Sequence, residues 1–216
     1  ALAKAEALAD SFNYNYTQLE TIQGNLGNET YVATTQINTI LEKIAMINDQ
    51  VKTLEPNGYV TNDLYDARDL LVDELNEYIP ISIERVPSGG MASEVAEGSL
   101  KITFNATIDG TPTPIVLVNG RNYAKVEILD SSATPKQIDG AVDEDGKFSL
   151  FSTFKVTGAV PLGSPAGTTG TVGNFEYDDL ESSHVSRGKI MALIDSYGHS
   201  MRDRNLSNGI YPDMMS

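Results

Sequence analysis

Cysteine is absent from the sequence, which excludes disulfide bonds and thiolate metal sites. Histidine is scarce. His184 and His199 do not form the His-Glu-x-x-His arrangement of a zinc site, so we interpret both as surface or capping residues. Long apolar runs are also missing, because none approaches the roughly 20 residues that a membrane span needs. No cleavable signal peptide is visible. We therefore expect a water-soluble chain without bound metal.

Basic residues are few compared with acidic ones, at 15 against 30, and the formal net charge is -15. Such a surface repels phosphate backbones and anionic lipids, which argues against nucleic-acid binding and membrane attachment. Hydrophobic residues make up 40% and charged residues 21% of the 216 residues, which is ordinary for a globular protein. The length allows one large domain or two small ones.

Signatures of catalysis and of cofactor binding are missing too. The glycine-rich stretch 163–173 lacks the Gly-Lys-Ser/Thr ending of a phosphate-binding loop, so we interpret it as a linker. The Asp-Glu-Asp-Gly run at 143–146 resembles part of a calcium loop, but the anchoring acids at the two ends of such a loop are absent, which favours a β-turn. We expect no catalytic, cofactor-binding or metal-binding residues and no enzymatic activity.

The strongest positive signal is a heptad pattern in the first quarter of the chain. Its positions alternate in steps of three and four without a slip, and only Gln23 and Thr30 among them are polar. This seam comprises Leu2, Ala5, Ala9, Phe12, Tyr16, Leu19, Gln23, Leu26, Thr30, Ala33, Ile37, Ile40, Ile44, Ile47, Val51 and Leu54. Gly24 and Gly27 could mark a hairpin, but a turn would break the register. We favour one rod about 80 Å long, ended by the Pro-Asn-Gly run at 56–58.

A second helix is predicted to begin at Thr61 or Asn62, either of which can cap it, and to end before Pro80. Its apolar arc comprises Leu64, Ala67, Leu71, Leu75, Tyr78 and Ile79, and its solvated arc comprises Asp66, Asp69, Asp73 and Glu77. We expect the core of the bundle to contain Ile37, Ile40, Ile44, Ile47, Val51 and Leu54 of the first helix with Leu64, Leu71 and Leu75 of the second.

Arg68 breaks this pattern, because its wheel angle places it inside the apolar arc between Leu64 and Leu75. Its own helix offers no paired acid on that face, and an unpaired buried guanidinium would be costly. Two interpretations stay open. Arg68 either crosses to an acid or to free carbonyls on a neighbouring helix and fixes the register of the bundle, or extends along its stem to water. We favour the first.

From Ile81 the apolar period changes to two, which predicts strands. The alternating residues are Leu100, Ile102, Phe104, Ala106 and Ile108, and then Phe148, Leu150, Phe154 and Val156. Turn pairs at 109–110, 119–120, 139–140 and 145–146 indicate an antiparallel arrangement. Pro112 and Pro114 suggest an edge or a loop, and the stretch 158–173 is interpreted as a flexible return linker.

A returning helix is predicted near the end of the chain, where Ile190, Leu193, Ile194, Tyr197 and Met201 share a face. The order of elements predicts an α+β fold: an elongated helical bundle with an inserted antiparallel β domain. The bundle would contain the long helix, the second helix and the returning helix. We assign residues 1–86 and 176–216 to the helical bundle domain and residues 87–175 to the inserted β domain.

Two stretches resemble a known family. Asn62-Asp63-Leu64-Tyr65-Asp66-Ala67-Arg68-Asp69-Leu70-Leu71-Val72-Asp73-Glu74-Leu75 resembles the N-D-L-x-D-x-R-D-x-L-x-D-E-L run of flagellar hook-associated proteins of the hook–filament junction. Residues 36–51 resemble the helix before that run, and residues 187–195 resemble the family's G-x-L-x-x-L-x-x helix. Since the sequence starts inside a helical pattern, we expect a central fragment without the terminal helices.

The resemblance implies a non-catalytic structural subunit of the bacterial flagellum that joins hook to filament. Such a subunit is exported through the type III apparatus and lies outside the cell, without a cleaved signal peptide. The implied partners are the hook protein, the second junction protein, identical subunits at eleven per turn, and an export chaperone bound to the missing terminus. The fragment itself is expected to be a monomer. The β region aligns poorly with the family, so its role stays open.

Two other classes of function compete with this interpretation. An exposed β domain on a helical stalk could instead be an extracellular binding or adhesin-like module, and this is the main alternative. An extracellular hydrolase is less well supported, because the sequence offers no nucleophile–base or metal constellation.

Overall fold

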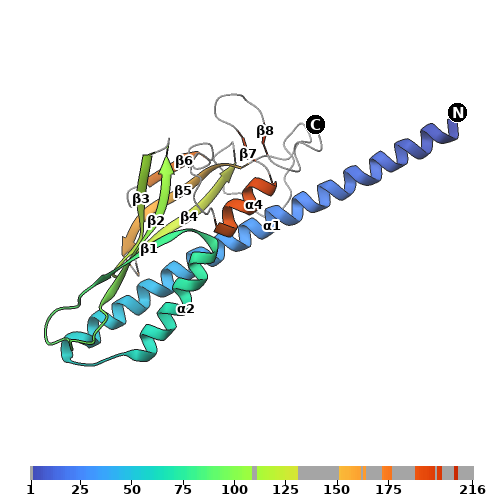
Figure 1. The fold of residues 1–216 in the computed structure, drawn as a ribbon. Helices are drawn as coiled ribbons and strands as arrows, with labels where there is room; N and C mark the ends of the chain where they lie inside the picture. The colour runs from blue at the N-terminus through green and yellow to red at the C-terminus, as the bar shows by residue number, and fades with distance from the viewer. Residues whose placement is uncertain are drawn as a thin grey trace.

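The structure, a computed structural model, describes residues 2–108, 111–130, 151–161, 163, 172–176, 188–197, 199–200 and 207–208. The molecule is elongated, and its longest element is the first helix (Figure 1). None of the helices in these ranges combines the length and the apolarity that crossing a membrane needs. The fold is α+β, as the order of elements predicts.

Helix α1 (Leu2–Leu54) is one uninterrupted rod, so the prediction of a single helix is confirmed and a hairpin at Gly24 and Gly27 is excluded. The short 3-10 helix η1 (Glu55–Asn57) follows and contains Pro56. Gly58 then adopts a left-handed conformation with φ of 83°. Because glycine reaches this conformation without steric strain and a right-handed helix cannot continue through it, the Pro-Asn-Gly run ends the rod.

The heptad seam of α1 is covered along only part of its length. Seam residues from Gln23 to Val51 are buried or half-buried, whereas Leu2, Phe12 and Tyr16 are largely exposed. Leu54 is also exposed, so its predicted place in the core is wrong. The chain turns into η1 at this point and buries the next residue, Glu55, instead.

Helix α2 (Asn62–Tyr78) begins and ends close to the predicted positions. Thr61 occupies the N-cap position, but its side chain makes no capping hydrogen bond. The four acids of the solvated arc are exposed as predicted, whereas the apolar arc needs correction. Ala67 is exposed, and Leu64 and Leu71 are only half-buried. The buried stripe comprises Tyr65, Arg68, Val72, Leu75 and the following Ile79. It is rotated from the predicted arc because another part of the chain covers α2 on this side.

One sheet contains eight strands within the described residues. They are β1 (Ile81–Val86), β2 (Ser99–Ile108), β3 (Thr111–Asn119), β4 (Asn122–Asp130), β5 (Phe151–Pro161), β6 (Val172–Glu176), β7 (His199–Ser200) and β8 (Ser207–Asn208). Neighbours run β1-β2-β3-β4-β5-β7-β8, with β6 beside β5, and all are antiparallel except β5 and β7. The predicted turn at Asn119-Gly120 joins β3 to β4.

The edge interpretation of Pro112 and Pro114 fits their strand. Both lie in the part of β3 that pairs with β2, while β3 meets β4 only near Val118 and Asn119. A residue without an N–H is tolerated where a strand has one paired side. The predicted linker at 158–173 begins too early, because residues 158–161 continue the pairing of β5 with β4 and residues 172–173 belong to β6.

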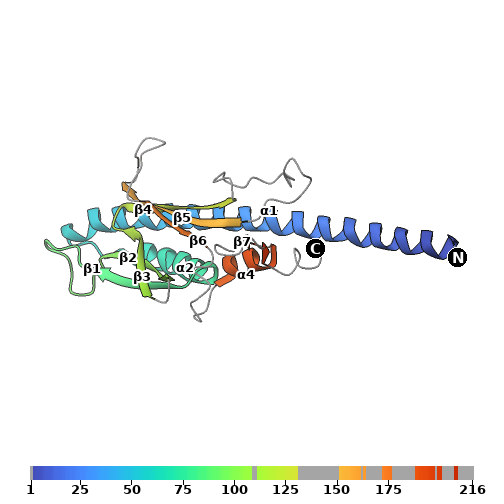
Figure 2. The same ribbon diagram turned by 90° about the horizontal axis from the view of Figure 1, so that it is seen from above.

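Helix α4 (Gly188–Tyr197) is the predicted returning helix, and it buries Ile190, Leu193, Ile194 and Tyr197. Met201, Phe148, Leu150 and the turn pairs at 109–110, 139–140 and 145–146 lie outside the described residues. Figure 2 shows α1 running between β4 and β5 on one side and α2 and α4 on the other. Side chains of α1, α2, α4 and β2 to β5 form one continuous apolar core. The division into a bundle domain and an inserted domain stays a prediction.

Candidate functional site

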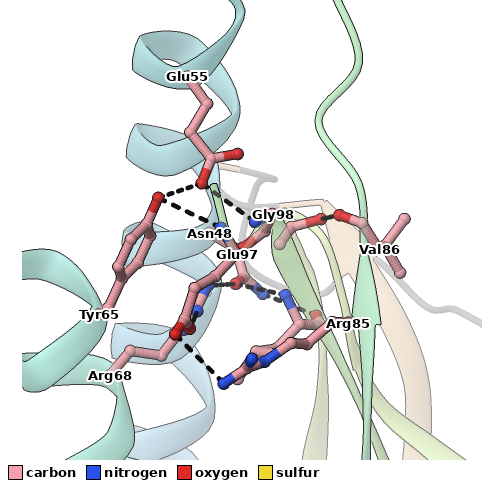
Figure 3. Close-up of polar contacts among 10 residues, drawn as sticks. Asn48, Glu55, Tyr65, Arg68, Arg85, Val86, Glu97 and Gly98 are labelled. Atoms are coloured by element: carbon pink, nitrogen blue, oxygen red, sulfur yellow. Dashed lines mark hydrogen bonds and ion pairs between the residues drawn. The ribbon is translucent and has the colours of Figure 1, made fainter. Parts of the chain in front are cut away.

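A cluster of buried polar side chains lies where α1, η1, α2 and the connection from β1 to β2 meet (Figure 3). We call it the polar junction and define it as Asn48, Glu55, Tyr65, Arg68, Glu97 and Gly98. Each of these residues is buried or half-buried. Polar groups removed from water must find hydrogen-bonding partners, so their geometry shows what the junction holds together.

Arg68 occupies the centre of the polar junction and is fully buried. Its Nη1 donates to the carbonyl oxygen of Gly98 at 2.7 Å, and its Nη2 donates to Oε2 of Glu97 at 2.9 Å. Nη1 also lies 3.4 Å from Oδ1 of Asn48, and the guanidinium carbon lies 5.4 Å from the centre of the Tyr65 ring. Arg68 therefore does not reach water. As the favoured interpretation predicts, it reaches an acid and a backbone carbonyl. Both belong to the connection from β1 to β2, however, and not to a neighbouring helix.

Burying the charge of Arg68 costs desolvation free energy, and the negative charge of Glu97 offsets part of this cost. Burial lowers the pKa of the Arg68 guanidinium below its ordinary value, and the negative charge of Glu97 opposes this shift. Glu97 is shared, because its Oε1 also lies 3.2 Å from the exposed Arg85 on β1. A buried cation with a charged partner and further hydrogen bonds meets the condition under which such groups are tolerated.

A second set of contacts fixes the same connection from the side of η1. Oε1 of the buried Glu55 accepts hydrogen bonds from the hydroxyl of Tyr65 and, at 3.0 Å, from the backbone N–H of Gly98. Gly98 has φ of +74°, and a β-carbon there would lie 2.2 Å from the carbonyl oxygen of Val86. Only glycine fits this position without moving the backbone.

Asn48 links the polar junction to the sheet. Its Nδ2 donates to the carbonyls of Leu100 at 2.9 Å and Gly120 at 3.1 Å, and its Oδ1 accepts from the N–H of Leu100 at 2.9 Å. The pairing of β2 with β3 begins at Lys101, so Leu100, one residue earlier, has no residue of β3 beside it. An amide that meets both backbone groups of one residue replaces a missing neighbouring strand.

The side-chain amide of Asn38 makes the same pair of hydrogen bonds with a residue of β4. Its Nδ2 donates to the carbonyl of Val126 at 2.8 Å, and its Oδ1 accepts from the N–H of Val126 at 2.7 Å. β3 and β4 pair only at two positions next to their turn, which leaves this part of β4 without β3 beside it. Two asparagines of α1 therefore fill the gap where the sheet divides.

Sequence reasoning missed Asn38, Asn48 and Glu55. Each asparagine directly follows a seam isoleucine in the most apolar part of α1, and this placement was the available signal. Gln23 was noticeable as a polar seam residue. It is buried, and its Nε2 donates to the carbonyl of Tyr197 at 3.2 Å, which ties α4 to α1. The partner could not be inferred from the sequence, because it lies 174 residues away.

The predicted core residues fall into two groups. Ile37, Ile40, Ile44, Val51 and Leu75 are fully buried, as is Arg68. Ile47, Leu64 and Leu71 are half-buried at the margin of the core. Only Arg68 among the predicted residues belongs to the polar junction.

In the described ranges, no group of three or more His, Asp or Glu side chains could hold a metal ion. The acidic run at 143–146 and His184 lie outside these ranges. The polar junction instead connects elements of the fold. Its hydrogen bonds join α2, η1 and the start of β2 to the last turns of α1.

These features define a rod-like α+β domain in which one long helix carries a sheet and two shorter helices. A family model described as "Flagellar hook-associated protein FlgK helical domain" matches residues 1–208. The chain belongs to this family.

Curated relatives agree with this assignment. The chain is 29% identical over 216 residues to flagellar hook-associated protein 1 of Bacillus subtilis, which covers 99% of the chain and 36% of that relative. It is 28% identical over 205 residues to the protein of the same name from Salmonella typhimurium, covering 91% of the chain and 32% of the relative. The chain thus spans about a third of the length of these relatives.

A solved structure shares the fold. The flagellar hook junction protein FlgK from Burkholderia pseudomallei matches with a TM-score of 0.59 and 18% identity. The match covers 89% of this chain and 27% of that one. At this identity the likeness concerns the fold alone.

Proposed function

We propose that the chain is part of a non-catalytic structural subunit that joins the hook of the bacterial flagellum to its filament. The observation that carries the proposal is the match of nearly the whole chain to hook-associated protein 1 of Bacillus subtilis. The solved relative is described as a flagellar hook junction protein, which agrees with this role.

The geometry of α1 supports a role in assembly. Leu2, Phe12 and Tyr16 continue the heptad seam beyond the part that α4 and the sheet cover, and they are exposed. An apolar seam of this kind packs against further helices in a bundle. In the assembled flagellum we expect these to be helices of the same protein or of its neighbours.

The proposal includes partners and location. The subunit would contact the hook protein, the second junction protein and identical subunits, and an export chaperone would bind a terminal segment. It would reach the cell exterior through the type III apparatus without a cleaved signal peptide. The net charge of -15 agrees with the absence of nucleic-acid and membrane partners from this set. The isolated fragment is expected to be a monomer.

Deletion of the parent gene tests the proposal. We expect cells with hooks but without filaments in electron micrographs, and flagellin monomers in the medium, because the filament would have no base to grow on. Normal filaments and normal motility would refute the proposal and would leave the display module on a helical stalk as the function to pursue. None of the relatives described above carries the name of an adhesin.

A further inference from the structure

Four large apolar side chains are exposed at the end of the molecule where α1 turns back into α2. Tyr59 is 62% and Val60 is 42% exposed in the connection from η1 to α2, and Met91 is 78% and Val95 is 69% exposed in the connection from β1 to β2. Both connections lie at the end opposite the N-terminus of α1 (Figures 1 and 2). We call these four residues the tip patch.

The two connections that carry the tip patch are held in place. The N–H of Met91 donates to the carbonyl of Pro56 at 3.2 Å, and a β-carbon on Gly90 would lie 3.0 Å from Cβ of Pro56. On its other side the connection from β1 to β2 is anchored at Glu97 and Gly98 by the polar junction. A preorganised surface loses little conformational entropy when it binds, and fixed apolar groups of this size mark protein contact sites.

The charges beside the tip patch specify the kind of partner. Segments 56–66 and 87–98 contain the acids Asp63, Asp66, Glu94 and Glu97 and no lysine or arginine, and of these acids Glu97 is already paired with Arg68 and Arg85. The first three of these acids are exposed. An acidic rim around an apolar centre is complementary to an apolar surface that is flanked by basic side chains.

A second copy of the chain does not supply such a surface at its far end. Residues 2–22 expose apolar side chains, but they contain the acids Glu6, Asp10 and Glu20 and only one base, Lys4. Two copies placed end to end would therefore bring like charges together, which disfavours that pairing.

We propose that the tip patch is the docking surface for a different protein subunit, which meets this end of the rod with an apolar surface flanked by lysine or arginine. This inference rests on the proposed function and deepens it, because it assigns the place where one of the joined partners binds. The polar junction then contributes to this contact as well as to stability, since it anchors Glu97 and Gly98 at the end of the connection that carries Met91 and Val95.

Cross-linking in assembled flagella identifies the occupant. The full-length protein would carry the photoreactive residue p-benzoylphenylalanine at position 91, and intact flagella would be irradiated and analysed by mass spectrometry. We expect a covalent product with another kind of flagellar subunit, through a peptide that combines apolar residues with lysine or arginine. A product with a second copy of this protein, or no product, would overturn the inference.

A matched pair of variants tests the apolar character of the patch. Met91→Ser combined with Val95→Ser should lower the number of filaments per cell at least tenfold, whereas Met91→Leu combined with Val95→Ile should leave it unchanged. Both proteins should melt at the wild-type temperature, because the side chains are exposed. Wild-type filament numbers in the serine variant, or equal losses in both variants, would contradict the inference.

The deletion strain separates this inference from the proposed function. If the deletion strain keeps its filaments, the proposed function fails. If the deletion strain loses its filaments and the serine variant keeps them, the proposed function stands and only the docking surface is wrong.

Discussion

At the scale of single residues, Arg68 shows how a charged side chain can be part of a protein interior. It joins three separate parts of the chain: Asn48 on α1, the ring of Tyr65 on its own helix, and Glu97 with Gly98 on the connection into β2. Such contacts have a narrow range of geometries, unlike apolar packing, which tolerates rearrangement. Arg68 therefore specifies how α2 lies against the start of β2.

Replacing Arg68 tests this role. Arg68→Met should lower the free energy of unfolding by about 2–4 kcal/mol, because the buried carbonyl of Gly98 loses its donor while Glu97 keeps Arg85 as a partner. Thermal denaturation should show a decrease in Tm of roughly 5–12 °C. The control is Arg85→Met, which removes an exposed ion pair with the same acid and should cost less than about 1 kcal/mol. An unchanged Tm for Arg68→Met would contradict the role assigned here.

At the scale of elements, α1 is a helix whose surroundings change along its length. Its first third is exposed on all sides, its middle packs against α4, and its last third packs against α2 and the sheet. Gly24 and Gly27 lie where the packing begins. A β-carbon on Gly24 would meet nothing within 4 Å, whereas one on Gly27 would lie 3.1 Å from Cε2 of Tyr197.

This difference predicts different effects on stability when each of the two glycines is replaced by alanine. Gly24→Ala should raise the free energy of unfolding by about 0.5–1 kcal/mol, because alanine is the better helix former and the site has space. Gly27→Ala should gain less or destabilise the fold, because the buried Tyr197 ring would have to shift. Differential scanning calorimetry of both variants measures the contrast. Equal stabilisation by the two substitutions would show that Tyr197 does not limit the site.

At the scale of the whole molecule, helices and sheet share their core. Ile37, Ile40 and Ile44 of α1 belong to the same apolar cluster as Leu100, Val126 and Val156 of the sheet. Asn38 and Asn48 add hydrogen bonds between the two parts. We propose that residues 87–175, although inserted in the sequence, fold together with the bundle.

Deletion of residues 87–175 tests this proposal. Replacing them with a short linker should abolish the cooperative thermal transition and cause aggregation, because the sheet-facing side of α1 and the partners of Arg68 would be lost. Circular dichroism and size-exclusion chromatography measure both effects. A monomeric product with a cooperative transition would instead support the prediction of an independent bundle domain.

The sequence patterns that predicted elements of the fold correctly are local ones. The heptad seam predicted α1, since a helix of this length imposes one period on many residues. The Pro-Asn-Gly run predicted its end, and alternation predicted β2. The arc of α2 was predicted less well, because a helical wheel gives the apolar direction of an isolated helix. The structure covers α2 on the side of Tyr65 and Arg68 as well, which makes those residues part of the interior.

The sequence by itself determined the α+β class, and it favoured the single rod and an internal position for Arg68, because periodicity, turn residues and a charge on an apolar face act over a few residues. Only the tertiary structure decided the partners of Arg68, the amide contacts of Asn38 and Asn48, and the hydrogen bond between Met91 and Pro56. These contacts join residues separated by tens of positions. Their choice depends on how helices and strands pack, which no local pattern encodes.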